Sequence, residues 1–173
     1  MKDKIIRELS NNGIEIGACK QGVAELEHSA SDVETLAGLF FKNAHFCLNN
    51  GFPTAGWIVD HFGGESAKYG IFCRENADIS NVRRAAVLAD IKVTAKYDNY
   101  SVGKIYAKGH SAIDVAVCGH ARIFIDAFDD VVVNVDASGD SHVYINQYGN
   151  ATIRYDKSDN AVVKVNVKHS NIY

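Results

Sequence analysis

The stretch from Ser101 to Ser170 repeats every ten residues, reading SVGKIYAKGH (101–110), SAIDVAVCGH (111–120), ARIFIDAFDD (121–130), VVVNVDASGD (131–140), SHVYINQYGN (141–150), ATIRYDKSDN (151–160) and AVVKVNVKHS (161–170). The third and fifth positions are each Ile or Val in six of the seven blocks, and positions nine and ten hold only Gly, Asp, His, Asn and Ser. A fixed period in a β-type sequence indicates stacked units that bury their apolar faces against neighbouring units. The repeat therefore predicts the architecture, although it leaves the chemistry open.

Apolar residues alternate at positions one, three, five and seven of the blocks, which is the pattern of a half-buried strand. A strand and turn of ten residues fit either an antiparallel meander or a β-solenoid. A meander with two-residue turns would place an outward residue at position eight on the inward face of the next strand, and turns of three residues would avoid this.

A second period favours the solenoid. Bulky residues alternate with smaller or more polar ones at position four (Lys104, Asp114, Phe124, Asn134, Tyr144, Arg154, Lys164) and at position eight (Lys108, Cys118, Phe128, Ser138, Tyr148, Ser158, Lys168). The true repeat is therefore twenty residues, and residues from successive coils would stack at about 4.8 Å. We predict a mainly β protein, a β-solenoid of about 20 residues per coil, right-handed by the usual chirality of parallel crossovers.

The chain before the repeat predicts a small helical head at 1–68, followed by the solenoid at 69–173, with the first coil or two within 85–106. Lys2 to Asn12 is predicted as a short amphipathic helix stopped by Gly13. Ser31 and Glu34 form a predicted capping box for a long helix that runs to Asn50. Thr54 is the predicted cap of a short helix that carries Trp57, Ile58 and Phe62 and ends at Gly63-Gly64.

Charge and composition exclude some classes of protein. The net charge is -3 and no basic run or stripe occurs, so no nucleic-acid partner is expected. The start MKDKIIRELSNN lacks the apolar core of a signal peptide, and no run of about 18 apolar residues could cross a membrane, so we expect a cytoplasmic protein. The four cysteines, Cys19, Cys47, Cys73 and Cys118, lack CxxC spacing and are interpreted as buried, reduced thiols rather than disulfides or a zinc site.

Metal binding is weighed and not predicted. His110 and His120 would lie at opposite edges of a twenty-residue coil and could not share an ion, and the trio Asp60, His61 and Glu65 is common in turns. Six aspartates between Ser111 and Asp140 could bind calcium on adjacent turns (Asp114, Asp126, Asp129, Asp130, Asp136, Asp140). Asp, Asn and Gly are also what tight turns require, so turn chemistry is the interpretation we adopt, with no metal and no cofactor.

No catalytic motif is present: the chain lacks GxSxG, HExxH and a P-loop. A glycosidase pair such as Asp126 and Asp136 stays an alternative, but the prediction is that the protein is not an enzyme.

Aromatic residues give the candidate site. Phe124, Phe128, Tyr144 and Tyr148 fall at positions four and eight of two blocks twenty residues apart, so the solenoid would arrange them as an outward square. An exposed square would mark a protein partner, self-association or a sugar-stacking platform, whereas packing of the N-terminal helices on it would make it interior.

The inward columns and the end of the repeat give two further expectations. One continuous core should contain Ile113, Val115, Ile123, Ile125, Val133, Val135, Val143 and Ile145. At the last coil, Lys164, Lys168 and His169 either guard an open edge or lie where a homo-oligomer forms.

The segments FFKNAHFCLNNGFP (40–53), KYGIF (68–72) and DNYSVGKIY (98–106), ahead of a degenerate strand repeat, resemble uncharacterised proteins of gut Bacteroidetes and their prophages. The resemblance covers nearly the whole chain and implies a helical head, a β-solenoid tail and a phage or mobile-element setting. It implies no activity. The function expected is a non-enzymatic structural or protein-interaction module, with a carbohydrate-binding module as the alternative.

Overall fold

The computed structural model describes residues 2–170 and 172–173, and the chain divides into two compact units, Met1–Tyr69 and Gly70–Tyr173. The predicted boundary between residues 68 and 69 differs from this division by one residue.

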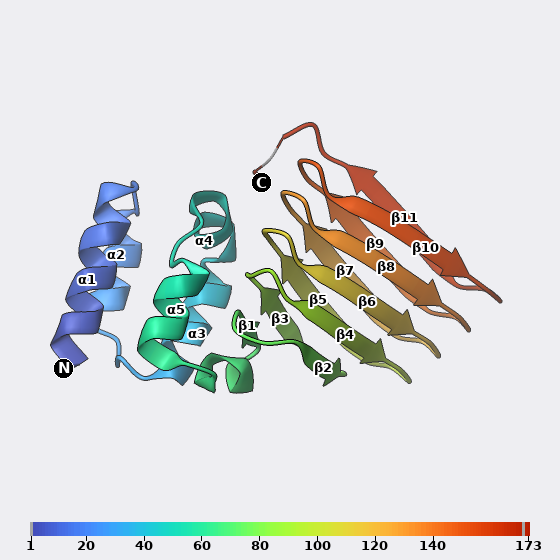
Figure 1. Cartoon of the computed structure of the whole chain (residues 1–173), viewed down its shortest axis with the longest axis horizontal. Helices are drawn as coiled ribbons and strands as arrows, with labels where there is room; N and C mark the ends of the chain where they lie inside the picture. Colours follow the sequence, from blue (N-terminus) through green and yellow to red (C-terminus); the bar gives the residue numbers. More distant parts are fainter. Residues whose placement is uncertain (1, 171) are drawn as a thin grey trace. The chain divides into compact units, whose positions relative to one another are not determined.

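The first unit is helical (Figure 1). Its elements are α1 (Lys2–Glu15), α2 (Lys20–Glu27), α3 (Val33–Lys42), α4 (Ala44–Asn50), α5 (Ala55–Phe62) and the 3-10 helix η1 (Glu65–Tyr69). The prediction that Gly13 stops the first helix is wrong, because α1 continues to Glu15 and the chain leaves the helix at Gly17, whose φ is 89°. Helix α2 was not predicted.

The helix caps correct one prediction and confirm another. Asp32, not Ser31, caps α3, because its Oδ1 accepts a hydrogen bond from the Thr35 amide at 2.9 Å. The predicted long helix is interrupted at Asn43, where α3 ends and α4 begins. Thr54 caps α5 as predicted: its Oγ1 accepts from the Trp57 amide at 3.1 Å.

The second unit is a β-solenoid of two parallel sheets (Figure 1). The six-stranded sheet has the order β1-β3-β5-β7-β9-β11 and the five-stranded sheet the order β10-β8-β6-β4-β2. The strands are β1 (Ile71–Phe72), β2 (Ala77–Ser80), β3 (Arg84–Val87), β4 (Lys92–Tyr97), β5 (Val102–Ala107), β6 (Ala112–Val117), β7 (Arg122–Ala127), β8 (Val132–Ala137), β9 (His142–Gln147), β10 (Thr152–Lys157) and β11 (Val162–Val167). All pairs are parallel, so the meander is excluded.

The register confirms the twenty-residue coil. Ile113 pairs with Val133, and the same offset of twenty holds from β3–β5 to β9–β11. Only the first strands differ: Ile71 pairs with Ala86 and Ala77 with Val93, so the coil begins with shorter offsets before the regular repeat.

The core lies between the two sheets, where the inward columns stack. All eight predicted core residues are at most 4% exposed (Ile113, Val115, Ile123, Ile125, Val133, Val135, Val143, Ile145). Position nine of the blocks takes the left-handed conformation, with φ of 67° at Gly119 and 56° at Asp129. This conformation explains why Gly and Asp recur there, as the turn interpretation requires.

Candidate functional site

The aromatic residues of the predicted square stack in two pairs, each joining successive coils of the six-stranded sheet. The rings of Phe124 and Tyr144 lie 5.3 Å apart at 17°, and those of Phe128 and Tyr148 lie 4.5 Å apart at 12°. Stacking across the twenty-residue period is therefore present, as predicted.

Exposure of the whole square is not observed, because its two position-eight residues are covered. Phe128 is 0% exposed and Tyr148 is 4% exposed, whereas Phe124 is 41% exposed. Neither Phe128 nor Tyr148 belongs to the hydrophobic core of the solenoid, so the pair is covered by other side chains rather than turned inward. The candidate surface is accordingly the Phe124–Tyr144 pair rather than a square.

Tyr173 packs on the buried pair, a contact that the sequence did not predict. Its ring lies 5.3 Å from that of Phe128 and 5.4 Å from that of Tyr148. Its hydroxyl donates to Asp126 Oδ2. Burial, followed by this hydrogen bond and the negative charge of Asp126, raises the pKa of Tyr173 well above its usual range.

Asp126 is a buried carboxylate, 1% exposed, with its oxygens fully engaged. It accepts from Asn146 Nδ2 at 2.7 Å and pairs with Lys104 Nζ at 2.8 Å. Burial lowers the pKa of Lys104, but the hydrogen bond and charge of Asp126 outweigh it, and the net shift is upward. Three side chains thus compensate the cost of burying this charge.

Polar and basic side chains surround the exposed aromatic pair. His142 Nδ1 and the Tyr144 hydroxyl oxygen are joined by a 3.4 Å hydrogen bond, and Lys164 Nζ lies 5.9 Å from the centre of the Tyr144 ring. Arg122 pairs in register with His142 on the adjacent strand and is exposed. An exposed stacked pair beside basic groups is suited to a flat ring-containing ligand.

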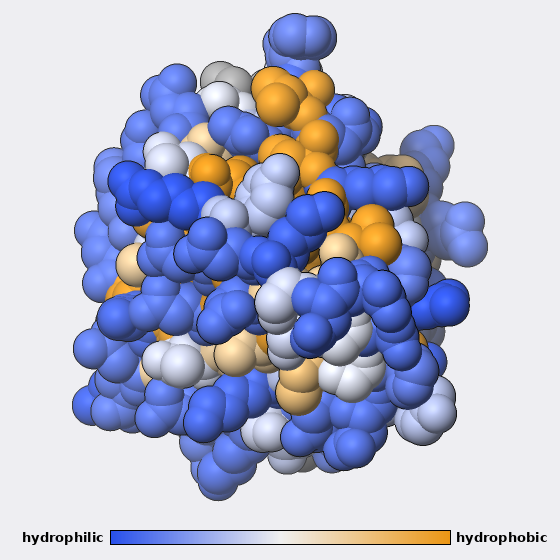
Figure 2. Space-filling view, turned by 90° about the vertical axis from the view of Figure 1, so that its right-hand side faces the viewer, coloured by the Kyte–Doolittle hydropathy of each residue, from blue (hydrophilic) through white to orange (hydrophobic). Residues whose placement is uncertain are grey.

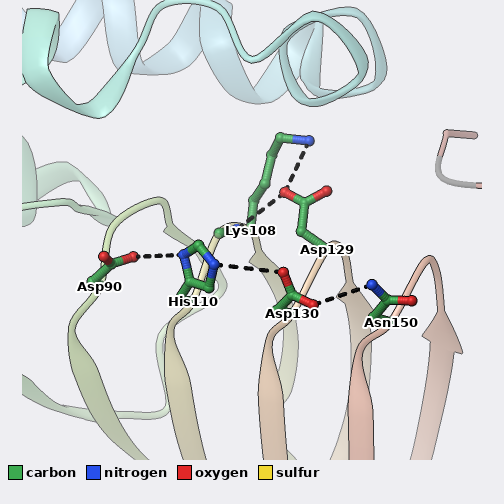
Figure 3. A network of polar contacts seen from close by, with 7 residues as sticks. Asp90, Lys108, His110, Asp129, Asp130 and Asn150 are labelled. Atoms are coloured by element: carbon green, nitrogen blue, oxygen red, sulfur yellow. Dashed lines mark hydrogen bonds and ion pairs between the residues drawn. The ribbon is translucent and has the colours of Figure 1, made fainter.

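Ladders of polar side chains follow the turns. Figure 3 shows one: His110 lies between Asp90 (Nδ1 to Oδ1, 3.3 Å) and Asp130 (Nε2 to Oδ2, 3.5 Å), and Asn150 donates to Asp130 at 3.2 Å. In the same view Lys108 pairs with Asp129 at 3.3 Å.

His120 lies on the opposite turn, where it contacts Asp140 at 3.6 Å and stacks on Tyr100. The separation of His110 and His120 onto opposite edges is confirmed. Carboxylates on the strands also bind side chains of neighbouring coils: Asp114 on β6, for example, contacts Lys92 Nζ at 2.7 Å and Asn134 Nδ2 at 2.8 Å.

The structure does not bring together the two groups of side chains that were considered for catalysis and for metal binding. Asp126 lies on β7 of the six-stranded sheet and Asp136 on β8 of the five-stranded sheet, so they do not form a glycosidase pair. His61 stacks on Trp57 at 4.0 Å, and Glu65 pairs with Lys68. No group of three His, Cys, Asp or Glu side chains that could hold a metal ion occurs among the described residues.

The four cysteines are free. Cys47 and Cys73 are buried as predicted, but Cys19 and Cys118 are exposed, so burial was wrongly predicted for these two. Cys19 caps α2, with its Sγ accepting from the Gly22 amide at 3.3 Å, and Cys118 opens a turn as Phe128 does.

The last coil leaves core-type side chains uncovered. Tyr155 is 47% and Val167 57% exposed, although both continue inward columns that are buried in earlier coils. Ile153, Val163 and Val165 are only partly buried. Figure 2 shows apolar surface gathered in the upper part of the view, at the height of the last strands in Figure 1.

No helix among the described residues is long and apolar enough to cross a membrane. Comparison of the chain with family models, with curated proteins and with solved structures finds no match.

Proposed function

We propose that the protein is a non-enzymatic structural or protein-interaction module, whose solenoid is a rigid scaffold that presents a binding surface at its last coil. The observation that carries the proposal is the exposure of Tyr155 and Val167, which occupy core columns. Exposed apolar surface of this kind marks an interaction site. The proposal includes a cytoplasmic location, which the free thiols support, and a phage or mobile-element origin, which rests on the resemblance described above.

The absence of catalysis is part of the proposal. It is supported by the ladders, because the carboxylates of Asp114, Asp126 and Asp130 are each bonded to a side chain of a neighbouring coil. A general acid or base needs an oxygen available to substrate.

Photo-crosslinking tests the binding surface. Tyr155 is replaced by a photoreactive phenylalanine analogue, and the same replacement at Tyr100, a 79% exposed residue of a turn, is the matched control. We expect a discrete protein adduct at position 155, made by a second copy or by another protein, and none at position 100. Absence of an adduct at position 155 would contradict the proposal.

A second candidate, carbohydrate binding, is favoured by one observation, the stack of the exposed Phe124 on the half-buried Tyr144. Sugar rings pack on such aromatic faces, and His142 and Arg122 lie beside them for hydrogen bonding. A glycan array with the wild type and the Phe124→Ala and Tyr144→Ala variants tests it, with Tyr100→Ala as control. Binding that both site variants lose supports this function, and equal binding by all variants opposes it.

A further inference from the structure

The outer edges of β10 and β11 pair with no described strand. These strands are the last members of the five-stranded and six-stranded sheets, respectively. Their outward-directed N–H and C=O groups are templates for further strands, and the half-covered side chains between them extend the core. A single flat strand would continue only one of the two sheets, so the occupant must offer two edges at once.

We propose that the occupant is a second copy of this chain, joined end to end about a twofold axis, so that β10 pairs with β10 and β11 with β11. This inference rests on the proposed function and names its partner. A twofold axis perpendicular to the sheets reverses strand direction, so both new pairs are antiparallel. A twofold interface uses the same end of both chains, so assembly through it closes at two copies.

The charges on β10 select a register. When two identical strands pair about a twofold axis, inward residues lie opposite inward residues of the second copy only if the axis passes through a residue and not between two residues. Centring on Tyr155 places Arg154 opposite Asp156 of the second copy, and the symmetry makes this pair twice. Centring on Arg154 or on Asp156 would instead oppose like charges.

Strand β11 agrees with that register. Centring on Val165, the residue at the same block position as Tyr155, places Lys164 opposite Asn166 and Val163 opposite Val167 of the second copy. Centring on Lys164 would oppose two lysines. In this arrangement Val167, 57% exposed in the single chain, gains an apolar neighbour.

Asp156 also lacks a counter-charge at the paired position of the adjacent strand. It pairs in register with Asp136 on β8, and like charges on adjacent strands repel. Arg154 of the second copy supplies the missing cation. Lys157 is the charged residue on the inward side of β10; it lies opposite Ile153 of the second copy, which its aliphatic stem can cover.

The size of this end predicts the affinity. Six-residue strands about 20 Å long in two sheets about 10 Å apart, with their side chains, give roughly 400 Å² per partner, about half of a standard interface. We therefore expect a micromolar dissociation constant rather than a nanomolar one.

Charge reversal tests the register. Sedimentation of the purified chain from about 1 to about 300 µM, a range that brackets micromolar affinity, should show a monomer–dimer equilibrium. Arg154→Asp and Asp156→Arg each oppose like charges and should weaken dimerisation at least tenfold. The double variant restores opposite charges and should recover most of the wild-type affinity. Arg83→Asp, at an exposed residue in the bend before β3 and away from the edge, is the control for folding and net charge and should dimerise as the wild type does.

Disulfide trapping tests the axis. In a Cys19→Ser, Cys118→Ser background, Tyr155→Cys should form an intermolecular disulfide under mild oxidation, because a residue at the centre of the pair lies opposite itself. Tyr100→Cys in the same background should not.

Three results would overturn the inference: a wild-type chain that is monomeric at every concentration, single charge variants that dimerise as tightly as the wild type, or no disulfide at position 155. If the purified chain is monomeric while the photoreactive residue at position 155 captures a different protein, the proposed function stands and the second copy is excluded. If neither occurs, both fail, and the inward Lys157 acts as a guard of the edge.

Discussion

Tyr97 and Gly103 show how one residue sets the identity of another within the core. Tyr97 is 1% exposed and occupies an inward position that is Ala or Val in the next two coils of its sheet. Gly103 is the one exception to Ile or Val at the third position, and a Cβ there would lie 2.5 Å from Tyr97 Cε1. The Tyr97 hydroxyl is held by a 3.0 Å hydrogen bond to the Val82 carbonyl, so the ring cannot move aside freely.

Gly103→Val should therefore lower the free energy of unfolding by about 1 to 3 kcal/mol through overpacking. Tyr97→Val should cost about 2 to 4 kcal/mol through the cavity that it leaves. The double variant should cost less than the sum, because the valine at 103 fills space vacated by the ring. Urea denaturation in a double-mutant cycle measures this coupling.

The matched control is Gly38→Ala in α3, where a Cβ meets no atom within 4 Å and no loss of stability is expected. Strict additivity of the Tyr97 and Gly103 substitutions would show that the two residues do not share one space.

Thiol reactivity is a second test at this scale. Burial raises the pKa of Cys47 to about 12, against a smaller opposing effect of a backbone hydrogen bond. Alkylation of the native protein at pH 8, a value near the unperturbed thiol pKa, should modify Cys19 and Cys118 and leave Cys47 and Cys73 unmodified. Mass spectrometry counts the adducts, and four should appear after denaturation. Native modification of Cys47 at the rate of Cys118 would contradict the described packing.

At the scale of elements, the burial of an inward residue depends on whether its strand lies in the middle or at the edge of the sheet. Val133 on β8 is 0% exposed, between β6 and β10, whereas Val163 on β11 is only partly buried at the open edge. Burial on both sides is what makes truncation costly.

Val133→Ala should thus cost about 1 to 3 kcal/mol, and Val163→Ala clearly less in a monomeric sample. Thermal or urea unfolding at low protein concentration measures both. Equal losses would show that the last coil is as well covered as the middle of the solenoid.

The Lys92–Asp114 pair joins β4 to β6 and gives a pH dependence. The hydrogen bond from Lys92, then that from Asn134, holds the pKa of Asp114 below its usual range. A carboxyl with a lowered folded pKa contributes stability that is present above its unfolded pKa, about 3.9, and is lost as pH falls through the folded value.

The stability difference between the wild type and Asp114→Asn should accordingly be constant near neutral pH and shrink below about pH 4. The difference should be small, because the Asp114 side chain is 38% exposed and solvent screens the pair. Urea midpoints across the acid range check the sign. A difference that grows on acidification would reverse the assigned role of Asp114.

The strands could be predicted from the sequence and several helical features could not, for physical reasons. The inward columns at positions three and five repeat the same preference for Ile or Val, so a single exception such as Gly103 does not obscure the pattern. Helix α2 buries none of its residues, and its weak apolar pattern gave no signal. Asp32 and Ser31 are both good caps, and the sequence does not say which one precedes the first turn.

The candidate site was predicted in part for a related reason. Pairing of Phe124 with Tyr144 follows from the period alone. Burial of Phe128 depends on what covers it, and its contact with Tyr173 joins residues 45 positions apart without any local pattern. Exposure of Tyr155 follows from being last in a column, which the repeat does not encode.

For the whole molecule, the solenoid is a one-dimensional stack in which each coil contacts its neighbours, so stability should vary along it. Amides of β5 to β8 should show the slowest hydrogen exchange, and amides of β10 and β11 faster exchange at low concentration. Exchange in β10 and β11 should slow as protein concentration rises, if a second copy covers them. Uniform exchange across all strands would indicate that the solenoid opens as one unit.

The constant offset of twenty residues between partners has a consequence for how such a chain can change in length. Inserting or deleting one full coil leaves every remaining residue in the same column, with the same kind of neighbour above and below. A change of ten residues would move each later strand to the opposite sheet. Phe124 and Tyr144 would then lie next to residues such as Asn134 from the other sheet, and the stacked aromatic pair and the polar ladders would be lost. Gene duplications and losses tolerated by this architecture should therefore come in steps of sixty nucleotides, since three encode each of the twenty residues of a coil.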